Sequence, residues 1–316
     1  MPAILTNNLS VINAENFVDS FINGDSNIYM AIGRGYDDEN DKIGDYKKDQ
    51  WEEWSDKNNP SIDESNPPTP RDTIAEQNDF RTSIIGIKRV QINNIMLMIP
   101  RIDWKAGMIF KPINTASIAG TRATDYFCIN SNNEVWMCIG TPEENNAVTK
   151  DKSEPLLSSD NVTLNTENKT YELTTTDGYT WRFMYNILAS VVNSGMLLEN
   201  WMPVPFNKHG VYPGGMLTET QDAKGDVNAN RTLGAYRVLV TATLRDEGDK
   251  IPYSAIYRQI GLIVDPRDSA GNFLTGDVYA DTEFNVLSGE LVYLENKSPI
   301  HREEGQNETL NLLLIF

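Results

Sequence analysis

The apolar positions of the chain recur in short runs, many of them alternating with polar positions, and this pattern predicts a series of β-strands. The first run is NIYMAIGR at 27–34, and a longer one, SIIGIKRVQINNIMLMIPRIDW, covers 83–104. Four further runs lie later in the chain: AYRVLVTATL (235–244), RQIGLIVDP (258–266), GELVYLEN (289–296) and TLNLLLIF (309–316). Short strands joined by polar turns are typical of a mainly β protein, so we expect antiparallel β-sandwiches with few short helices.

Two segments in the middle of the chain predict β-hairpins. DYFCINSNNEVWMCIG (125–140) has a turn signal at Asn132–Asn133, and KTYELTTTDGYTWRFMYNIL (169–188) has one at Asp177–Gly178. Asn and Gly are favoured in tight turns because they tolerate positive φ. Alternation after the second turn places three aromatic side chains on one face of a strand: Tyr179, Trp181 and Phe183.

One helix is predicted near the start of the chain, in NAENFVDSFINGD (13–25). Its apolar residues repeat at the i, i+4 spacing of a helical face, as Phe17 and Phe21 do. Asn13 is a suitable N-cap, and Gly24 is a residue at which helices often end.

Two long segments lack a sustained period and predict loops. Residues 35–72 are acidic and Pro-rich, and we expect a surface loop there, pinned by Trp51 and Trp54. Residues 193–232 are interrupted by Pro and Gly and also predict a loop. A chain of 316 residues is long enough for two domains or one large one.

The formal net charge is −18, with a sequence pI of about 4.5. A negative field of this size repels phosphate, so we expect no nucleic acid and no anionic membrane as partners. No apolar run approaches the ~20 residues of a membrane helix. The first residues lack the cationic and apolar segments of a signal peptide. Cys128 and Cys138 are the only cysteines, which suits a reducing compartment, and we expect them to be reduced core residues.

No motif for catalysis or for a cofactor is recognisable. The two histidines, His209 and His301, lack a second ligand at zinc-binding spacing. The acidic cluster that begins at Asp37 would need Gly and Glu at the sixth and twelfth positions of an EF-hand loop, but Lys42 and Lys48 stand there. A solvated acidic loop is the favoured interpretation, and an irregular calcium site is the alternative. By elimination we expect a protein that is not an enzyme and that works through its surfaces.

Several segments resemble a known family, in order and spacing, along nearly the whole chain. IYMAIGR followed at a distance by PPTPRDT resembles an N-terminal signature of contractile-phage tail proteins. Four further segments resemble the dimeric, β-structured baseplate wedge protein of T-even-type phages: IPRIDW (99–104), DGYTWRFMYNI (177–187), RQIGLIVDP (258–266) and SGELVYLENKSPI (288–300) with the closing strand. The loop at 35–72 is longer and more acidic here, and 105–235 matches only in patches, so contacts in that region are not transferred.

The resemblance implies a structural subunit of the baseplate wedge, in the virion tail and assembled in the host cytoplasm. It implies a mainly β fold of two domains, of which the first is assembled from both chain ends (1–95 plus 236–316, with the short N-terminal helix) and the second, 96–235, is inserted. It implies a homodimer whose neighbours are other wedge proteins, with no catalysis and no cofactor. The alternative is a carbohydrate-binding adhesin or tail-fibre-associated module, because exposed tryptophans such as Trp51, Trp54 and Trp201 stack well on sugars. A glycosidase ranks third.

The candidate interface residues are Trp51, Trp54, Arg101, Asp103, Trp104, Tyr179 and Trp181. In IPRIDW, we expect Pro100 to end a strand, Arg101 to pair with Asp103, and Trp104 to be buried. A strand-end ion pair is the simpler interpretation of that segment, and fold stability is the simpler interpretation of the aromatic face. We also expect the closing strand, 309–316, to be an inner strand covered on both faces, in the domain that contains the 27–34 strand.

Overall fold

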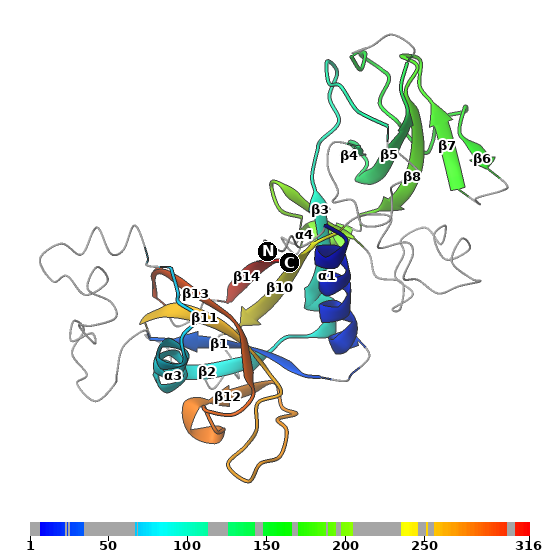
Figure 1. Ribbon diagram of the computed structural model, residues 1–316. Helices are drawn as coiled ribbons and strands as arrows, with labels where there is room; N and C mark the ends of the chain where they lie inside the picture. The colour runs from blue at the N-terminus through cyan, green and yellow to red at the C-terminus, as the bar shows by residue number, and fades with distance from the viewer. Residues whose placement is uncertain are drawn as a thin grey trace, which may run out of the picture. The chain divides into compact units, whose positions relative to one another are not determined.

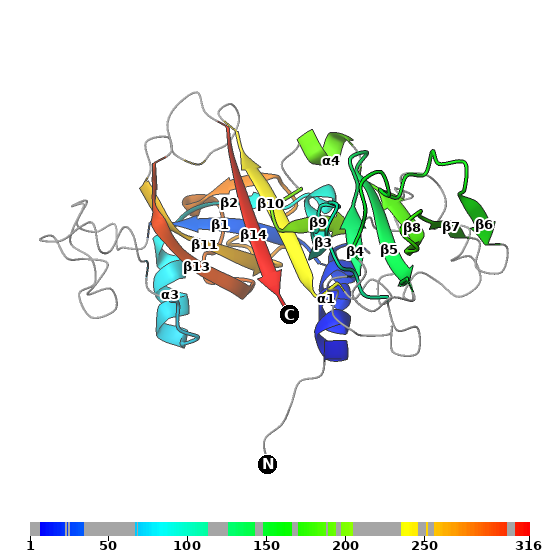
Figure 2. The same cartoon turned by 90° about the horizontal axis from the view of Figure 1, so that it is seen from above.

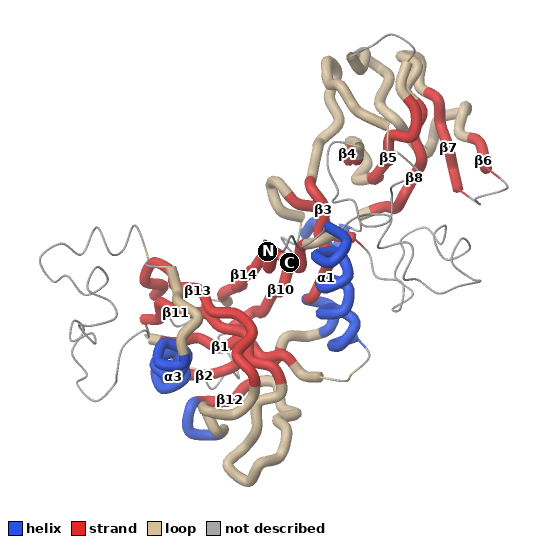
Figure 3. Tube along the Cα trace, viewed as in Figure 1, coloured by secondary structure: helices blue, strands red, loops and turns tan. Residues whose placement is uncertain are grey.

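A computed structural model gives the fold, and it confirms a mainly β protein built from antiparallel sheets (Figures 1 and 3). The residues that the structure describes are 7–22, 24, 26–34, 67, 69–112, 126–142, 148–165, 170–187, 189–193, 197–204, 235–245, 251, 256–301 and 307–316. The chain divides into two compact units: Met1–Ile22, Ile95–Val240 and Leu313–Phe316 form the first, and Asn23–Asn94 and Thr241–Leu312 form the second. The two domains inferred from the sequence, 1–95 plus 236–316 and 96–235, stay a prediction.

The first sheet has five strands and belongs to the second unit. From edge to edge its strands are β12 (Val278–Ala280), β2 (Ile84–Arg89), β1 (Ile28–Gly33), β11 (Ile256–Val264) and β13 (Glu290–His301). The central strand β1 is buried along its whole length, as its unbroken apolar run predicts. Both edges are poor templates for a further strand, because β12 has three residues and β13 shifts register twice against β11.

The second sheet has four strands. Its order is β14 (Glu308–Ile315), β10 (Arg237–Leu244), β3 (Ile95–Pro100) and β9 (Trp201–Val204). Strand β9 lies in the segment that the sequence predicts as a loop, so that prediction is wrong at these residues. Pro203 explains the difference, since a strand at the end of a sheet can carry a proline without losing a ladder hydrogen bond.

The closing strand differs from its prediction. In the sheet order β14 stands at the end, beside β10, so it is an edge strand and not an inner one (Figure 2). Leu310, Leu312 and Leu314 are buried on one face, whereas Asn311 and Ile315 on the other face are exposed. The apolar alternation predicted the buried face correctly. The apolar residues at 313 and 315 led us to expect that the second face is covered as well, and it is not.

The third sheet belongs to the first unit and has five strands. Its order is β4 (Phe127–Ile129), β5 (Glu134–Gly140), β8 (Thr180–Asn186), β7 (Thr170–Thr174) and β6 (Thr163–Asn165). Both predicted hairpins are confirmed. Asn133 has φ +61° in the first turn and Gly178 has φ +91° in the second, as the Asn-Asn and Asp-Gly signals require.

Within the described residues, the helices are α1 (Asn7–Ile22), α3 (Ile74–Ser83) and α4 (Ala189–Asn193), with short 3₁₀ turns η2 (Ile92–Asn94) and η5 (Asp281–Glu283). Helix α1 packs against β3 and runs through Asn13, so the predicted N-cap there is wrong. Helix α3 was not predicted, because Phe80 is its only buried large apolar residue and no apolar stripe marks it. Thr73 caps α3 by accepting a hydrogen bond from the Glu76 N–H.

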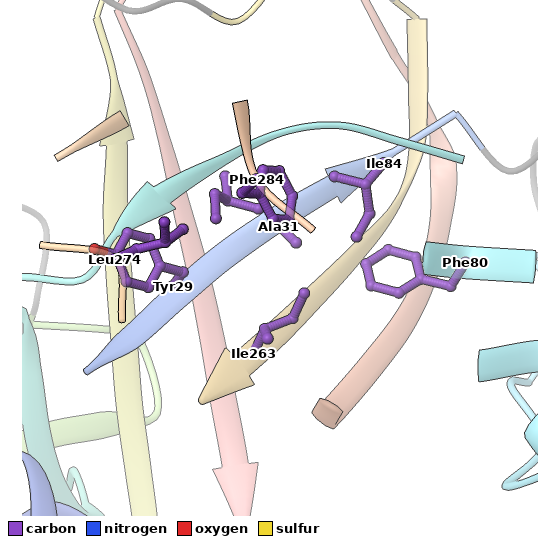
Figure 4. Packing of buried hydrophobic residues seen from close by; sticks show 8 residues of the cluster. Tyr29, Ala31, Phe80, Ile84, Ile263, Leu274 and Phe284 are labelled. Atoms are coloured by element: carbon purple, nitrogen blue, oxygen red, sulfur yellow. The ribbon is translucent and has the colours of Figure 1, made fainter. Parts of the chain in front are cut away.

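Helix α3 delivers Phe80 into the core of the second unit (Figure 4). The core residues come from α3 and the first sheet and from the connections that follow β11: Tyr29, Ala31, Phe80, Ile84, Ile87, Ile263, Leu274 and Phe284. The Phe80 ring occupies the space over Gly261, where an added Cβ would lie 2.5 Å from the ring. The glycine in RQIGLIVDP is therefore required by the close approach of an aromatic ring.

Candidate interaction surfaces

The structure brings five of the seven predicted interface residues into the first unit. Trp51 and Trp54, like the acidic cluster at Asp37, lie outside the described residues. The five are Arg101, Asp103, Trp104, Tyr179 and Trp181. They gather in two places: the strand end at IPRIDW and the aromatic core behind the third sheet.

The predicted pairing of Arg101 with Asp103 is confirmed. The Arg101 Nε–H donates to Asp103 Oδ1 at 2.7 Å, and Nη2 donates to Oδ2 at 3.3 Å. The same guanidinium donates from Nη1 to the carbonyl oxygen of Leu198 at 3.1 Å, and the Arg101 backbone N–H donates to Asn200 O. The forked side chain therefore braces the segment that leads into β9. Half of the Asp103 side chain is exposed, so the ion pair itself contributes only about 0–1 kcal/mol.

Trp104 ties the IPRIDW segment to the third sheet. Its backbone N–H donates to Ile129 O at 2.8 Å, and the Ile129 N–H donates to Ile102 O at 2.9 Å. These two bonds make a short parallel bridge along β4, the edge of the sheet. The Trp104 side chain is only partly buried, against the aromatic core, so the expected burial is met in part.

Tyr179 and Trp181 lie inside the first unit. Trp181 meets Phe110 edge to face, with ring centroids 5.0 Å apart, and Tyr179 lies beside both rings. Both side chains are buried, together with Trp136 and Phe183. The aromatic face that the alternation predicts is therefore a core face in this chain. An interface role for these residues stays a prediction.

The Asp177–Gly178 turn holds this aromatic face in register. Asp177 Oδ1 accepts hydrogen bonds from the Thr175 hydroxyl and the Tyr179 N–H, and Oδ2 accepts one from the Lys150 N–H at 3.1 Å. One carboxylate thus shapes its own turn and fastens a neighbouring segment at Lys150.

A second carboxylate, Glu134, is buried directly after the turn of the first hairpin. Its Oε2 accepts hydrogen bonds from Asn130 Nδ2 at 2.6 Å, Trp136 Nε1 at 3.3 Å and the Leu157 N–H at 3.0 Å. A buried charge is tolerated where several donors replace its hydration. Glu134 therefore fixes the loop at Leu157 to the first hairpin. No local pattern in the sequence marks this residue.

Cys128 and Cys138 lie on β4 and β5 and are both buried free thiols, as predicted. Burial raises the pKa of Cys128 well above its usual value, with smaller contributions in the same direction from Cys138 and Glu154. Burial also raises the pKa of Cys138, to about 12, against a smaller lowering contribution from the backbone of Gly140. Both thiols are therefore protonated at neutral pH and are poor nucleophiles and metal ligands.

Trp201 is one of the tryptophans expected to stack on a sugar, but one face of its ring is covered by Arg237. The guanidinium carbon of Arg237 lies 3.7 Å from its ring centroid. This cation–π contact leaves that face unavailable for stacking on a sugar. The contact instead links β9 to β10 across the strand between them.

The described residues offer little to metals or membranes. They contain no group of three or more His, Cys, Asp or Glu residues placed to hold a metal ion. Within the same part of the chain, no helix has the length and apolar character needed to cross a bilayer.

The polar residues of the site brace loops and strands, and the aromatic ones fill a core. The fold and the site together define a mainly β protein whose side chains in this region support loops and fill a core. The family model described as bacteriophage T4, Gp8 matches residues 150–316. The baseplate wedge protein gp8 of Enterobacteria phage T4 is 24% identical over 323 residues, which cover 92% of this chain and 93% of that protein. The chain belongs to the bacteriophage T4 Gp8 family, and it is a T4-type baseplate wedge protein.

Proposed function

We propose that this chain is a structural subunit of the baseplate wedge of a contractile phage tail, where it acts without catalysis. The observation that carries the proposal is the similarity to a baseplate wedge protein along 92% of the chain. Braced loops on rigid antiparallel sheets support it, because a subunit of a large assembly must keep its shape while its loops carry contacts. The subunit would be assembled in the host cytoplasm and reside in the virion tail.

The finer proposal is a homodimer that joins other wedge proteins. Light scattering on the purified chain tests the first half: a particle of twice 35.6 kDa is expected, and a monomer at micromolar concentration contradicts it. Mass spectrometry of purified virions tests the second half. The chain is expected in baseplates at a fixed ratio to other tail proteins, and its absence from virions would overturn the proposal.

Candidate interface residues in this proposal are Arg101, Asp103 and Trp104 at the IPRIDW strand end, with Tyr179 and Trp181 supporting them from the core. Trp51 and Trp54 remain candidates on the acidic loop. Substitution of Asp103 by Ala should weaken co-purification with tail proteins if this strand end is an interface. Unchanged co-purification would assign Arg101 and Asp103 a purely structural role.

A further inference from the structure

We infer that two turns of the second unit, 266–274 and 284–289, together form a preorganised contact surface for another protein. We call these two turns the double turn. The partner it fits has an apolar pocket with a basic rim. That the partner is another baseplate protein rests on the proposed function.

The first turn is held by its own hydrogen bonds. Asp268 Oδ1 accepts from the N–H groups of Ala270 and Asn272, and its Oδ2 accepts from Asn272 Nδ2. Backbone bonds join Asp268 to Gly271 and Asn272, and an isolated bridge pairs Arg267 with Phe273. The Asn272 bonds come first among the causes that lower the pKa of Asp268. The turn therefore presents Phe273 from a braced backbone.

The second turn is fastened to the first. The Asn285 N–H donates to Arg267 O at 2.9 Å, and the Ser288 hydroxyl accepts from the Arg267 N–H at 2.7 Å. Within the second turn, the Leu287 N–H donates to Asn285 Oδ1, and the Ser288 N–H donates to Asn285 O. The two turns thus form a single braced unit.

The double turn is anchored from beneath. Leu274 and Phe284 enter the core, Leu274 beside Tyr29 and Phe284 beside Ala31 (Figure 4). The buried side chain of Arg81 donates to the carbonyl oxygens of Val286, Ser288 and Gly289 at 2.9–3.2 Å. Neighbouring side chains in an extended backbone point in opposite directions. Phe273, which precedes Leu274, and Leu287, which follows Val286, therefore point outward.

The outward side chains are large and apolar. Phe273 is 51% exposed and Leu287 is 60% exposed, and the Arg267 guanidinium covers part of the Phe273 ring at 3.9 Å. Isolated apolar residues are common on surfaces, but here two are held on one braced unit next to an arginine. Aromatic and arginine side chains are enriched at the energetic centres of interfaces, and a rigid presentation lowers the entropy lost on binding.

Charge defines the partner further. Residues 265–290 contain six acidic side chains and one basic side chain, Arg267. Asp281, Glu283 and Glu290 are exposed; Asp277 is exposed too, but its carboxylate is paired with Lys88 Nζ at 2.8 Å. Two copies meeting through the double turn would bring these carboxylates together, which disfavours a second copy. A different protein with Lys or Arg around an apolar pocket complements both features. A sugar fits less well, because the polar groups of the first turn are already bonded to one another.

Site-specific crosslinking in phage particles tests the inference. A photoreactive phenylalanine analogue is placed at position 273 or 287, and the matched control is position 74, since Ile74 is 79% exposed in the same unit. Positions 273 and 287 should crosslink to a different polypeptide at a peptide rich in apolar and basic residues. Crosslinks that go only to a second copy, or that are no stronger than those at position 74, would overturn the inference.

Variants provide a second, independent test. Phe273→Ser combined with Leu287→Ser should reduce incorporation into particles by about thirtyfold or more, as expected for interface hot spots. Ile74→Ser should leave incorporation unchanged, and Phe273→Tyr should retain most of it. The double variant should keep the melting temperature of the parent, and if it does not, the crosslinks decide. A folded double variant that is incorporated normally contradicts the inference.

The two proposals fail in different ways. If the unmodified chain is absent from particles, the wedge function fails and the partner class named here fails with it. If the chain is present but positions 273 and 287 crosslink no better than position 74, the wedge function stands and only the double turn loses its role.

Discussion

Arg81 and Gly289 lie 208 residues apart in the chain, and the Arg81 guanidinium donates a 2.9 Å hydrogen bond to the Gly289 carbonyl oxygen. The same side chain also bonds Val286 O and Ser288 O. Burial lowers the pKa of Arg81, yet an arginine remains charged at any ordinary pH. The buried guanidinium therefore donates its hydrogen bonds to three backbone carbonyl groups, and these carbonyl groups have the guanidinium as a donor.

Arg81→Met should destabilise the chain by about 3 kcal/mol, because it leaves buried carbonyl groups without donors. Arg81→Lys should recover only part of that loss, since an ammonium group does not reproduce the fork of the guanidinium. Urea unfolding measures both effects. Equal stability of the parent and the Met variant would show that water replaces the guanidinium at these carbonyls.

Glu134→Ala should cost about 2–4 kcal/mol, because Trp136 Nε1 and the Leu157 N–H lose their acceptor and Asn130 Nδ2 keeps only Pro155 O. Glu134→Gln keeps one acceptor oxygen and should cost less. Asp160→Ala is the matched control, since Asp160 is exposed, and should change stability by less than about 0.5 kcal/mol. Thermal unfolding of the three variants measures the order. The prediction is wrong if Ala at positions 134 and 160 has the same effect.

Gly261→Ala should destabilise by about 1–3 kcal/mol, because the new Cβ would lie 2.5 Å from the Phe80 ring. Gly271→Ala meets no atom within 4 Å, but its φ of +89° makes it strained, so a loss of about 1 kcal/mol is expected. Adding Phe80→Leu should rescue part of the first loss and none of the second. Denaturant midpoints of the single and double variants provide the comparison.

The thiols of Cys128 and Cys138 should not react with a disulfide reagent at pH 8 in the folded chain, and both should react after unfolding. Burial raises both pKa values above the usual thiol value of 9.0, and that of Cys138 to about 12. A raised pKa stabilises the folded state fully below pH 9, and this stabilisation is lost as pH rises from 9 toward 12. Cys138→Ala should flatten part of that alkaline slope. Rapid labelling of the native chain would contradict the burial argument.

Leu312→Ala should destabilise by about 2–5 kcal/mol, because the Leu312 side chain is buried. Ile315→Ala, three residues later on the same strand, removes a side chain that is 62% exposed and should change stability by less than about 0.5 kcal/mol. Chemical unfolding of the two variants checks the assignment of faces on β14. Comparable losses would mean that Ile315 is covered in solution.

Strand positions and hairpin turns were predictable because they depend on local signals. The Asn-Asn and Asp-Gly pairs fixed two turns, and the Tyr179–Trp181 alternation identified a buried face. Sheet order was not predictable, since pairing between distant strands leaves no local pattern. For that reason the closing strand was expected inside a sheet and is instead at its edge. Helix α3 was not predicted, because only one large apolar side chain, Phe80, anchors it and a single residue makes no helical pattern.

The candidate site was predictable only where two residues act locally, as Arg101 and Asp103 do. The hydrogen bonds of Glu134 to Leu157 and of Arg81 to Gly289 join residues far apart in the sequence. The exposure of Phe273 and Leu287 was not predictable either, because the hydrophobic pattern does not show whether a single apolar residue in a turn is buried. These features depend on tertiary packing that the pattern of one sequence does not encode.

The blunted edges of the first sheet limit how this unit can join a neighbour. A strand that pairs with a sheet edge forms many backbone hydrogen bonds at once and is hard to release. The short β12 and the irregular β13 offer few backbone groups for such pairing. Contacts made at the edges of this sheet are therefore expected to form through side chains. Such contacts can be released and remade one at a time, so a rearranging assembly can exchange neighbours while the sheet itself stays intact.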